Sequence, residues 1–114
     1  MKKRHWLGWG LVSTLWIGVV GLAALAPDAD AGKQVYQRRC KMCHGIDGKG
    51  SAAVARMMKV EIPALDSDAV QEQTDEELAK VITKGKGKMV AVKGISEQDV
   101  ANVIAYLRTL AKKP

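Results

Sequence analysis

Apolar and small side chains recur at the spacing of a helix face over residues 33–44. Gly32, Tyr36, Cys40 and Cys43 follow one another at intervals of four, four and three residues, as neighbours on one side of an α-helix do. Three glycines within the next seven residues predict the end of this stretch. The pattern therefore predicts a helix that presents both cysteines on one face.

Two further helices are predicted in the C-terminal half. Thr74 begins a capping box, Thr-Asp-Glu-Glu, and the helix that follows it ends at Gly85. Ser96 caps the last helix, whose apolar residues keep a period near 3.6: Val100, Val103, Ile104, Leu107, Leu110 and Ala111. A shorter helix is predicted after Ser51, and residues 60–73 read as an ordered loop. No stretch alternates with a period of two, so the sequence predicts an all-α domain with short helices.

The N-terminal segment has the three parts of an export signal. A basic start precedes an uncharged apolar run at residues 6–26, and the tripeptide Ala-Asp-Ala at 29–31 offers small side chains to a peptidase. We expect a cut after Ala31 that removes residues 1–31. An earlier Ala-Leu-Ala is a poorer site because Pro27 follows it. The alternative is an uncleaved anchor over residues 6–26, since an uncharged run of this length can span a bilayer.

The remaining domain, residues 32–114, is short of large apolar side chains. It has 83 residues, of which 15 are basic and 10 acidic, so its net charge is about +5. Tyr36 and Tyr106 are its only aromatic residues, because all three tryptophans lie in the first sixteen positions. A domain this small usually needs a disulfide, a metal or a cofactor to stabilise its core. Its size and the lack of a glycine fingerprint exclude a two-domain enzyme cleft and a doubly wound nucleotide-binding fold.

Cys40-Lys41-Met42-Cys43-His44 has the spacing at which haem is attached covalently. Two cysteines three residues apart on a helix point the same way, so both sulfurs can add to the vinyl groups along one porphyrin edge. The alternatives are a structural disulfide, which would close a very small loop, a thioredoxin-like redox pair, which needs a βαβ context, and a zinc site, which needs four ligands. The sequence therefore predicts one covalently attached haem c per chain, held by Cys40 and Cys43.

His44 is the candidate proximal ligand of the iron. It is the only histidine in residues 32–114, so ligation by two histidines of one chain is excluded. A histidine ligand usually donates its other ring N–H to a carbonyl or carboxylate, and we expect the Pro63 carbonyl to accept it. The alternative is that Pro63 is a plain loop proline.

Met89 is the candidate distal ligand. It follows a run broken by glycines between two predicted helices and belongs to no helical face. Met42 lies too close to His44 to reach the far side of the iron, and Met57 and Met58 are expected to pack in the short helix. Ligation by one histidine and one methionine raises the reduction potential of a haem relative to ligation by two histidines. We therefore expect a high-potential carrier of single electrons.

Taken together, these residues resemble the class I monohaem c-type cytochromes over essentially the whole of residues 32–114. The positions that carry the resemblance are Gly32, Tyr36, the motif from Cys40 to Gly45, Pro63, the run from Gly85 to Met89, and Tyr106-Leu107. The resemblance implies three main short helices wrapped around a covalently attached haem with one exposed edge. It also implies that the first and last helices cross, with Gly32 and Tyr36 against Val103, Tyr106 and Leu107. One departure is Val90, where the family often has a proline that helps to fix the loop.

Charge placement suggests how such a carrier would meet its partners. Five lysines and no acid lie between Leu78 and Ser96, and we expect Lys86, Lys88 and Lys93 to surround the exposed haem edge. A basic rim would steer an acidic redox protein into a short-lived contact; the alternative is a solvated face that aids solubility. Nucleic acid is not an expected partner, membrane contact is transient or through an uncleaved anchor, and we expect a monomer.

Three functions follow from this interpretation. The first is a shuttle in the periplasm or on the outer face of the cytoplasmic membrane, which is an electron carrier and not an enzyme. The second is an electron-accepting subunit of an exported oxidoreductase complex. The third is a five-coordinate haem protein that binds gas or has peroxidatic activity, if Met89 does not bind the iron.

Overall fold

The computed structural model describes Gly18 and residues 25–113, so most of the predicted export segment lies outside the described residues. Residues 25–113 form six helices: α1 (Ala29–Arg39), α2 (Lys41–His44), α3 (Ala52–Met58), α4 (Asp68–Gln71), α5 (Asp75–Lys84) and α6 (Glu97–Thr109). A single bridge between Lys86 and Met89 is the only β-type pairing in this part of the chain. The all-α prediction is confirmed. None of the helices in the described residues has both the length and the apolar character needed to cross a membrane.

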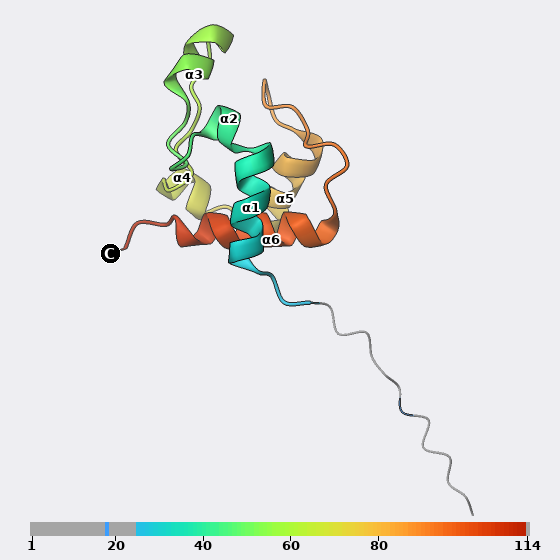
Figure 1. Ribbon diagram of the computed structural model, residues 1–114. Helices are drawn as coiled ribbons and strands as arrows, with labels where there is room; N and C mark the ends of the chain where they lie inside the picture. Colours follow the sequence, from blue (N-terminus) through green and yellow to red (C-terminus); the bar gives the residue numbers. More distant parts are fainter. Residues whose placement is uncertain (1–17, 19–24, 114) are drawn as a thin grey trace, which may run out of the picture.

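The first and last helices of the domain cross each other (Figure 1). A Cβ atom on Gly32 would lie 1.8 Å from the carbonyl oxygen of Asn102, so the two backbones approach as closely as glycine alone permits. Beside this contact, the rings of Tyr36 and Tyr106 lie 5.2 Å apart at an interplanar angle of 56°, a favourable aromatic arrangement. The crossing implied by the resemblance is confirmed.

The start of α1 differs from the prediction. The helix begins at Ala29, and the Asp28 side chain caps it by accepting from the backbone N–H groups two and three residues further on. The backbone N–H of Asp28 also donates to Oδ1 of Asn102 at 2.8 Å, and Asn102 is buried in α6. The predicted cleavage after Ala31 therefore falls within the first turn of α1, and among the described residues Asp28 and residues 29–31 form the capped start of that helix.

The end of α1 differs as well. A single helix was predicted over residues 33–44, but α1 ends at Arg39 and α2 is a separate turn. The break lies at Cys40, whose φ of −121° and ψ of −33° depart from helical values. The backbone N–H of Cys40 still donates to the Tyr36 carbonyl at 2.9 Å, so α2 continues from α1 in a changed direction.

The core lies where α1 and α5 pack on α6. Its buried apolar residues are Val35, Tyr36, Leu65, Val70, Leu78, Ile82, Val100, Val103, Ile104 and Leu107. The predicted capping box of α5 is present, since the Thr74 hydroxyl accepts from Glu77 N at 3.1 Å and the Glu77 carboxylate accepts from Thr74 N at 2.8 Å. Ser96 caps α6 and Gly85 ends α5, as predicted.

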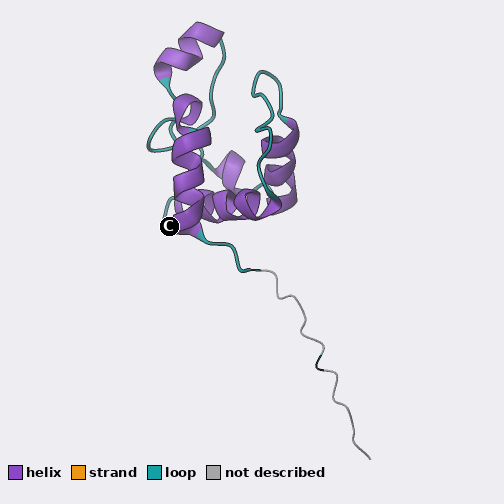
Figure 2. Ribbon diagram, turned by 45° about the vertical axis from the view of Figure 1, so that its right-hand side comes forward, coloured by secondary structure: helices purple, strands orange, loops and turns teal. Residues whose placement is uncertain are grey.

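Two arms stand on α6 (Figure 2). One arm contains α1, α2 and α3, and the other contains α5 and the loop from Gly85 to Ile95. The predicted ligands are divided between them, because Cys40, Cys43 and His44 lie on the first arm and Met89 lies on the second.

Candidate functional site

The two cysteines lie at the ends of the first turn after α1. Cys40 is half-buried and Cys43 is exposed, and both are free thiols, so the disulfide alternative is not formed here. Burial raises the pKa of the Cys40 thiol above its ordinary value, and the neighbouring Arg39 opposes this shift. Two free thiols three residues apart are the groups that thioether attachment of a porphyrin requires.

His44 ends α2 and is half-buried. Burial lowers the pKa of its imidazole, which favours the neutral form that binds metals. Its Nδ1 is shielded from solvent and has no hydrogen-bond partner among the described residues. Pro63 is exposed, and its carbonyl does not accept the predicted bond in this structure. A buried ring nitrogen without a partner is unusual for a histidine that only packs, so these residues fit a role at a bound group.

The backbone around His44 is fixed by several hydrogen bonds. Its carbonyl accepts from Gly50 N at 2.7 Å, and the Cys43 carbonyl accepts from Ser51 N at 2.9 Å. The Tyr36 hydroxyl donates to the carbonyl of Gly45, the next residue, at 2.5 Å. Burial is the main cause that raises the pKa of Tyr36, so the hydroxyl keeps its proton. The sequence had indicated Tyr36 only as a packing residue, because nothing in the spacing reveals this long-range donor.

The glycine-rich loop after His44 packs on the segment that contains Pro63. Leu65 N donates to the Gly48 carbonyl at 2.8 Å, and a Cβ on Gly50 would lie 3.3 Å from Ile62. An ion pair joins the same two segments, with Lys49 Nζ 2.7 Å from Asp66 Oδ2. The hydrogen bond from Lys49 is the main cause that lowers the pKa of the Asp66 carboxyl. Sequence reasoning did not find this pair.

Met89 lies in a tight turn on the other arm. Lys86 and Met89 exchange two backbone hydrogen bonds of 3.0 Å, and Gly87 between them has a φ of 57°, which favours glycine. The chain returns so closely that a Cβ on Gly85 would lie 2.6 Å from the Met89 carbonyl. Met89 is half-buried, whereas Val90, at the position where a proline is common, is 81% exposed. The turn therefore fixes the Met89 backbone without that proline.

Met57 and Met58 were both expected to pack in the short helix, and only one of them does. Met58 is half-buried, but Met57 is 75% exposed. The prediction that Met57 packs in the short helix is wrong, because the apolar face of α3 is too small to cover it: none of the helix's residues is buried.

The three lysines of the predicted docking rim lie on the Met89 loop and are exposed. They differ in their contacts. Lys88 Nζ donates to the carbonyl of Met58 at 3.0 Å, whereas the side chains of Lys86 and Lys93 make no hydrogen bond among the described residues. Lys88 is therefore engaged within the chain.

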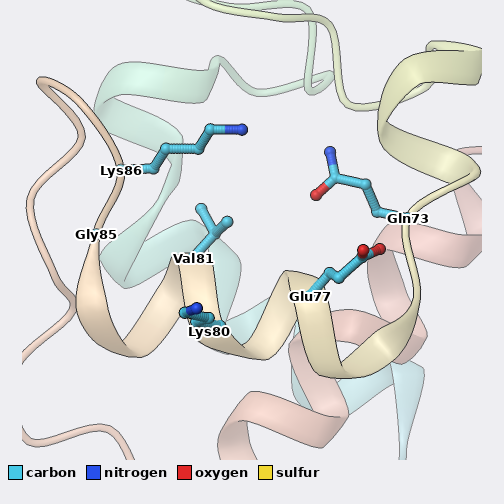
Figure 3. A pocket seen from close by; sticks show the side chains of 6 residues that line it. All are labelled: Gln73, Glu77, Lys80, Val81, Gly85 and Lys86. Carbon is cyan, nitrogen blue, oxygen red and sulfur yellow. The ribbon is translucent and has the colours of Figure 1, made fainter.

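A pocket of about 500 Å³ opens on α5 at the start of this loop (Figure 3). The Lys86 ammonium and the Gln73 amide point across it toward each other, and Val81 points into it from α5. Its lining residues are Gln73, Glu77, Lys80, Val81, Gly85 and Lys86. Val81 is only half-buried, because it faces this pocket.

Comparisons with known proteins identify the family of this chain. The family described as "Cytochrome C oxidase, cbb3-type, subunit III" matches residues 27–107. Cytochrome c6 of Picosynechococcus is 31% identical over 118 residues, which cover 98% of this chain and 97% of that protein. The cbb3-type cytochrome c oxidase subunit CcoP of Rubrivivax gelatinosus is 31% identical over 98 residues, which cover 80% of this chain and 30% of that protein.

A solved structure supports the fold. The KustC0563 c-type cytochrome superposes with a TM-score of 0.61 at 23% identity, covering 71% of this chain and 98% of its own. With the matches above, the chain belongs to the cytochrome c family. The predicted resemblance is confirmed, and the family assigns haem c and electron transfer to this chain.

Proposed function

We propose that this protein carries single electrons on one haem c that is covalently attached through Cys40 and Cys43. His44 and Met89 would be the two axial ligands, and the protein would act in the periplasm or on the outer face of the cytoplasmic membrane after export by its N-terminal segment. The observation that carries the proposal is the arrangement on the first arm: two free thiols next to an imidazole that is half-buried and whose Nδ1 lacks a partner.

When bound, the haem supplies an iron that gains and loses one electron. The chain's own residues would hold and shield it. The thiols of Cys40 and Cys43 would attach it, and His44, whose pKa is lowered by burial, would present a neutral imidazole with a lone pair for the metal. With His44 and Met89 as its two protein ligands, the iron would have no position left for a substrate, which favours a carrier over an enzyme.

The optical spectrum of the oxidised holoprotein tests the ligand set. A sulfur-to-iron charge-transfer band is expected in the wild type and is expected to disappear in Met89→Ala. Met57→Ala is the matched control, because that thioether is exposed on α3 and should leave the band unchanged. A band that survives Met89→Ala, or that is absent from the wild type, would reject Met89 as the distal ligand.

Carbon monoxide binding separates this proposal from the five-coordinate alternative. Slow or absent binding to the reduced protein is expected if Met89 occupies the distal position. Rapid and tight binding would favour a gas-binding or peroxidatic protein.

A second candidate function is an electron-accepting subunit of an oxidoreductase complex. It is favoured by the match to an oxidase subunit family over residues 27–107 and by the similarity to CcoP. Co-purification separates the two functions, since a shuttle is expected to elute as a monomer and a subunit together with its complex.

We propose that acidic redox proteins dock against the basic loop around Met89. All three lysines are exposed. The side chains of Lys86 and Lys93 make no hydrogen bond among the described residues, and Lys88 adds its charge although its ammonium also bonds within the chain. Oxidation by the physiological acceptor is expected to slow as ionic strength rises, because salt screens exposed charges. It should slow further in Lys86→Glu; rates that respond to neither change would reject the docking surface.

A further inference from the structure

The loop that carries Met89 is held from two sides by side chains of other elements. Lys88 Nζ donates to the Met58 carbonyl at 3.0 Å, and Arg39 Nη2 donates to the Lys93 carbonyl at 2.6 Å. The partners are 30 and 54 residues apart in sequence, so both bonds exist only in the folded chain. They hold the loop immediately before Met89 and shortly after it.

Both bonds lead to the arm that carries the cysteines and His44 (Figure 2). Arg39 ends α1 and directly precedes Cys40. Met58 ends α3, which joins α2 through the bond from Ser51 N to the Cys43 carbonyl. The last carbonyls of a helix lack partners within the helix, and a cation there is favoured by the helix dipole. Lys88 therefore has a local reason to bind at this position.

Within its own arm, the loop has a fixed shape. The turn between Lys86 and Met89 closes on itself, and Val92 N donates to the Ile82 carbonyl at 2.8 Å. None of these backbone bonds reaches the other arm. The side chains of Lys88 and Arg39 supply that connection.

We propose that Lys88 and Arg39 are positioning residues that hold Met89 against the iron and thereby determine how readily an outside ligand displaces it. This inference rests on the ligation proposed above. Lys88 would act through the Met58 carbonyl and Arg39 through the Lys93 carbonyl, and neither residue is proposed as an iron ligand.

The chain offers a matched control for each residue. Lys86 is exposed on the same turn as Lys88, but its side chain makes no hydrogen bond among the described residues. Arg38 is exposed beside Arg39 and also makes none in this part of the chain. Lys88→Ala and Lys86→Ala remove the same charge from the same turn without adding a second thioether beside Met89. Arg39→Gln and Arg38→Gln remove the same charge at the end of α1.

The experiment is a titration of the ferric holoproteins with imidazole, which is neutral near pH 8 and so responds little to the lost charge. Lys88→Ala and Arg39→Gln are expected to bind imidazole about five-fold more tightly than the wild type, the equivalent of an exposed hydrogen bond of about 1 kcal/mol. Lys86→Ala and Arg38→Gln should remain within about two-fold. Lys88→Arg keeps a donor and is expected to restore the wild-type affinity.

The outcomes separate this inference from the proposed function. If the two variants of each matched pair bind imidazole equally well, and the wild type shows the sulfur-to-iron band, the positioning role is overturned and the ligation stands. A wild type without the band would overturn both. If Lys88→Ala does not fold, as judged by circular dichroism, the arginine pair decides the result.

Discussion

The close crossing of α1 and α6 makes a sharp prediction for Gly32→Ala. The new Cβ would lie 1.8 Å from the Asn102 carbonyl oxygen, 2.3 Å from its carbon and 2.8 Å from Val103 N. All three are backbone atoms, so no side-chain rotation can relieve the contact. The two helices would have to move apart by more than 1 Å to reach an ordinary carbon–oxygen contact of about 3.3 Å.

The magnitude follows from two opposing effects. Overpacking a buried contact costs about 1–3 kcal/mol, and a backbone clash lies at the upper end of this range. Alanine is the better helix former, which returns about 1 kcal/mol to the free energy of unfolding. We therefore expect a net loss of about 2 kcal/mol, a large share of the stability of a small domain. In a domain of this size, that loss lowers the melting temperature by about 8–16 °C.

Thermal and denaturant unfolding of the holoprotein, followed by circular dichroism, measures this loss. Gln34→Gly is the control, because Gln34 is exposed on α1 and reports the helix propensity alone. If Gly32→Ala were as stable as the wild type, or more stable, propensity would outweigh the contact and the argument for the close crossing would be refuted.

Three further predictions concern other parts of the structure. Tyr36→Phe should lower the free energy of unfolding by about 1 kcal/mol, because a buried hydrogen bond at the end of α2 is lost; unchanged denaturant midpoints would contradict it. The Asp66 carboxyl has a pKa lowered by its bond from Lys49, so the pair stabilises the folded state at neutral pH and this contribution disappears as the pH falls through the folded-state pKa. The stability difference between wild type and Asp66→Asn should therefore stay constant above about pH 5 and shrink as the pH falls below about 4, the ordinary pKa of an Asp carboxyl. The exported chain should retain Asp28, and a mature mass that begins after Ala31 would show that the cap of α1 is dispensable.

The helix boundaries that depend on local chemistry could be predicted from the sequence. The capping box at Thr74, the cap at Ser96 and the glycine that ends α5 all lie as predicted. Each of these signals acts within four residues, so the sequence contains the whole interaction. The motif from Cys40 to His44 could be recognised for the same reason, because all of its residues lie within five consecutive positions.

The elements that depend on distant partners could not be predicted. The single turn of α4 has no side-chain cap. It is held by Gln71, which donates to the carbonyls of Leu65 and Leu107, and by Arg108, which donates to the Gln71 and Gln73 carbonyls. These bonds reach α6, more than thirty residues away.

The start of α1 was missed for a different reason. Asp28 and the small residues after it resemble the end of an export signal, and the same residues form the capped first turn of a helix. Whether these residues form the end of a signal or the start of a helix depends on Asn102, seventy-four residues away in α6. Its Oδ1 accepts a hydrogen bond from Asp28 N. A cut after Ala31 would place a charged amino terminus on Gly32, which is buried beneath α6. Burial of an unpaired charge is costly, so the folded structure favours retention of this turn.

The proposed ligands lie on different arms, so the rigidity of the iron site depends on how the arms are joined. On one arm, the Cys43 and His44 carbonyls are fixed by bonds from Ser51 and Gly50; on the other, a closed turn fixes Met89. The arms meet at the base through the packing of α1 and α5 on α6, and at the open side through Lys88 and Arg39. Close-packed contacts at the base resist small displacements, whereas the two exposed hydrogen bonds are individually weak. The base would therefore keep the ligand geometry similar in both oxidation states, as fast electron transfer requires, and the open side would determine how readily Met89 is displaced.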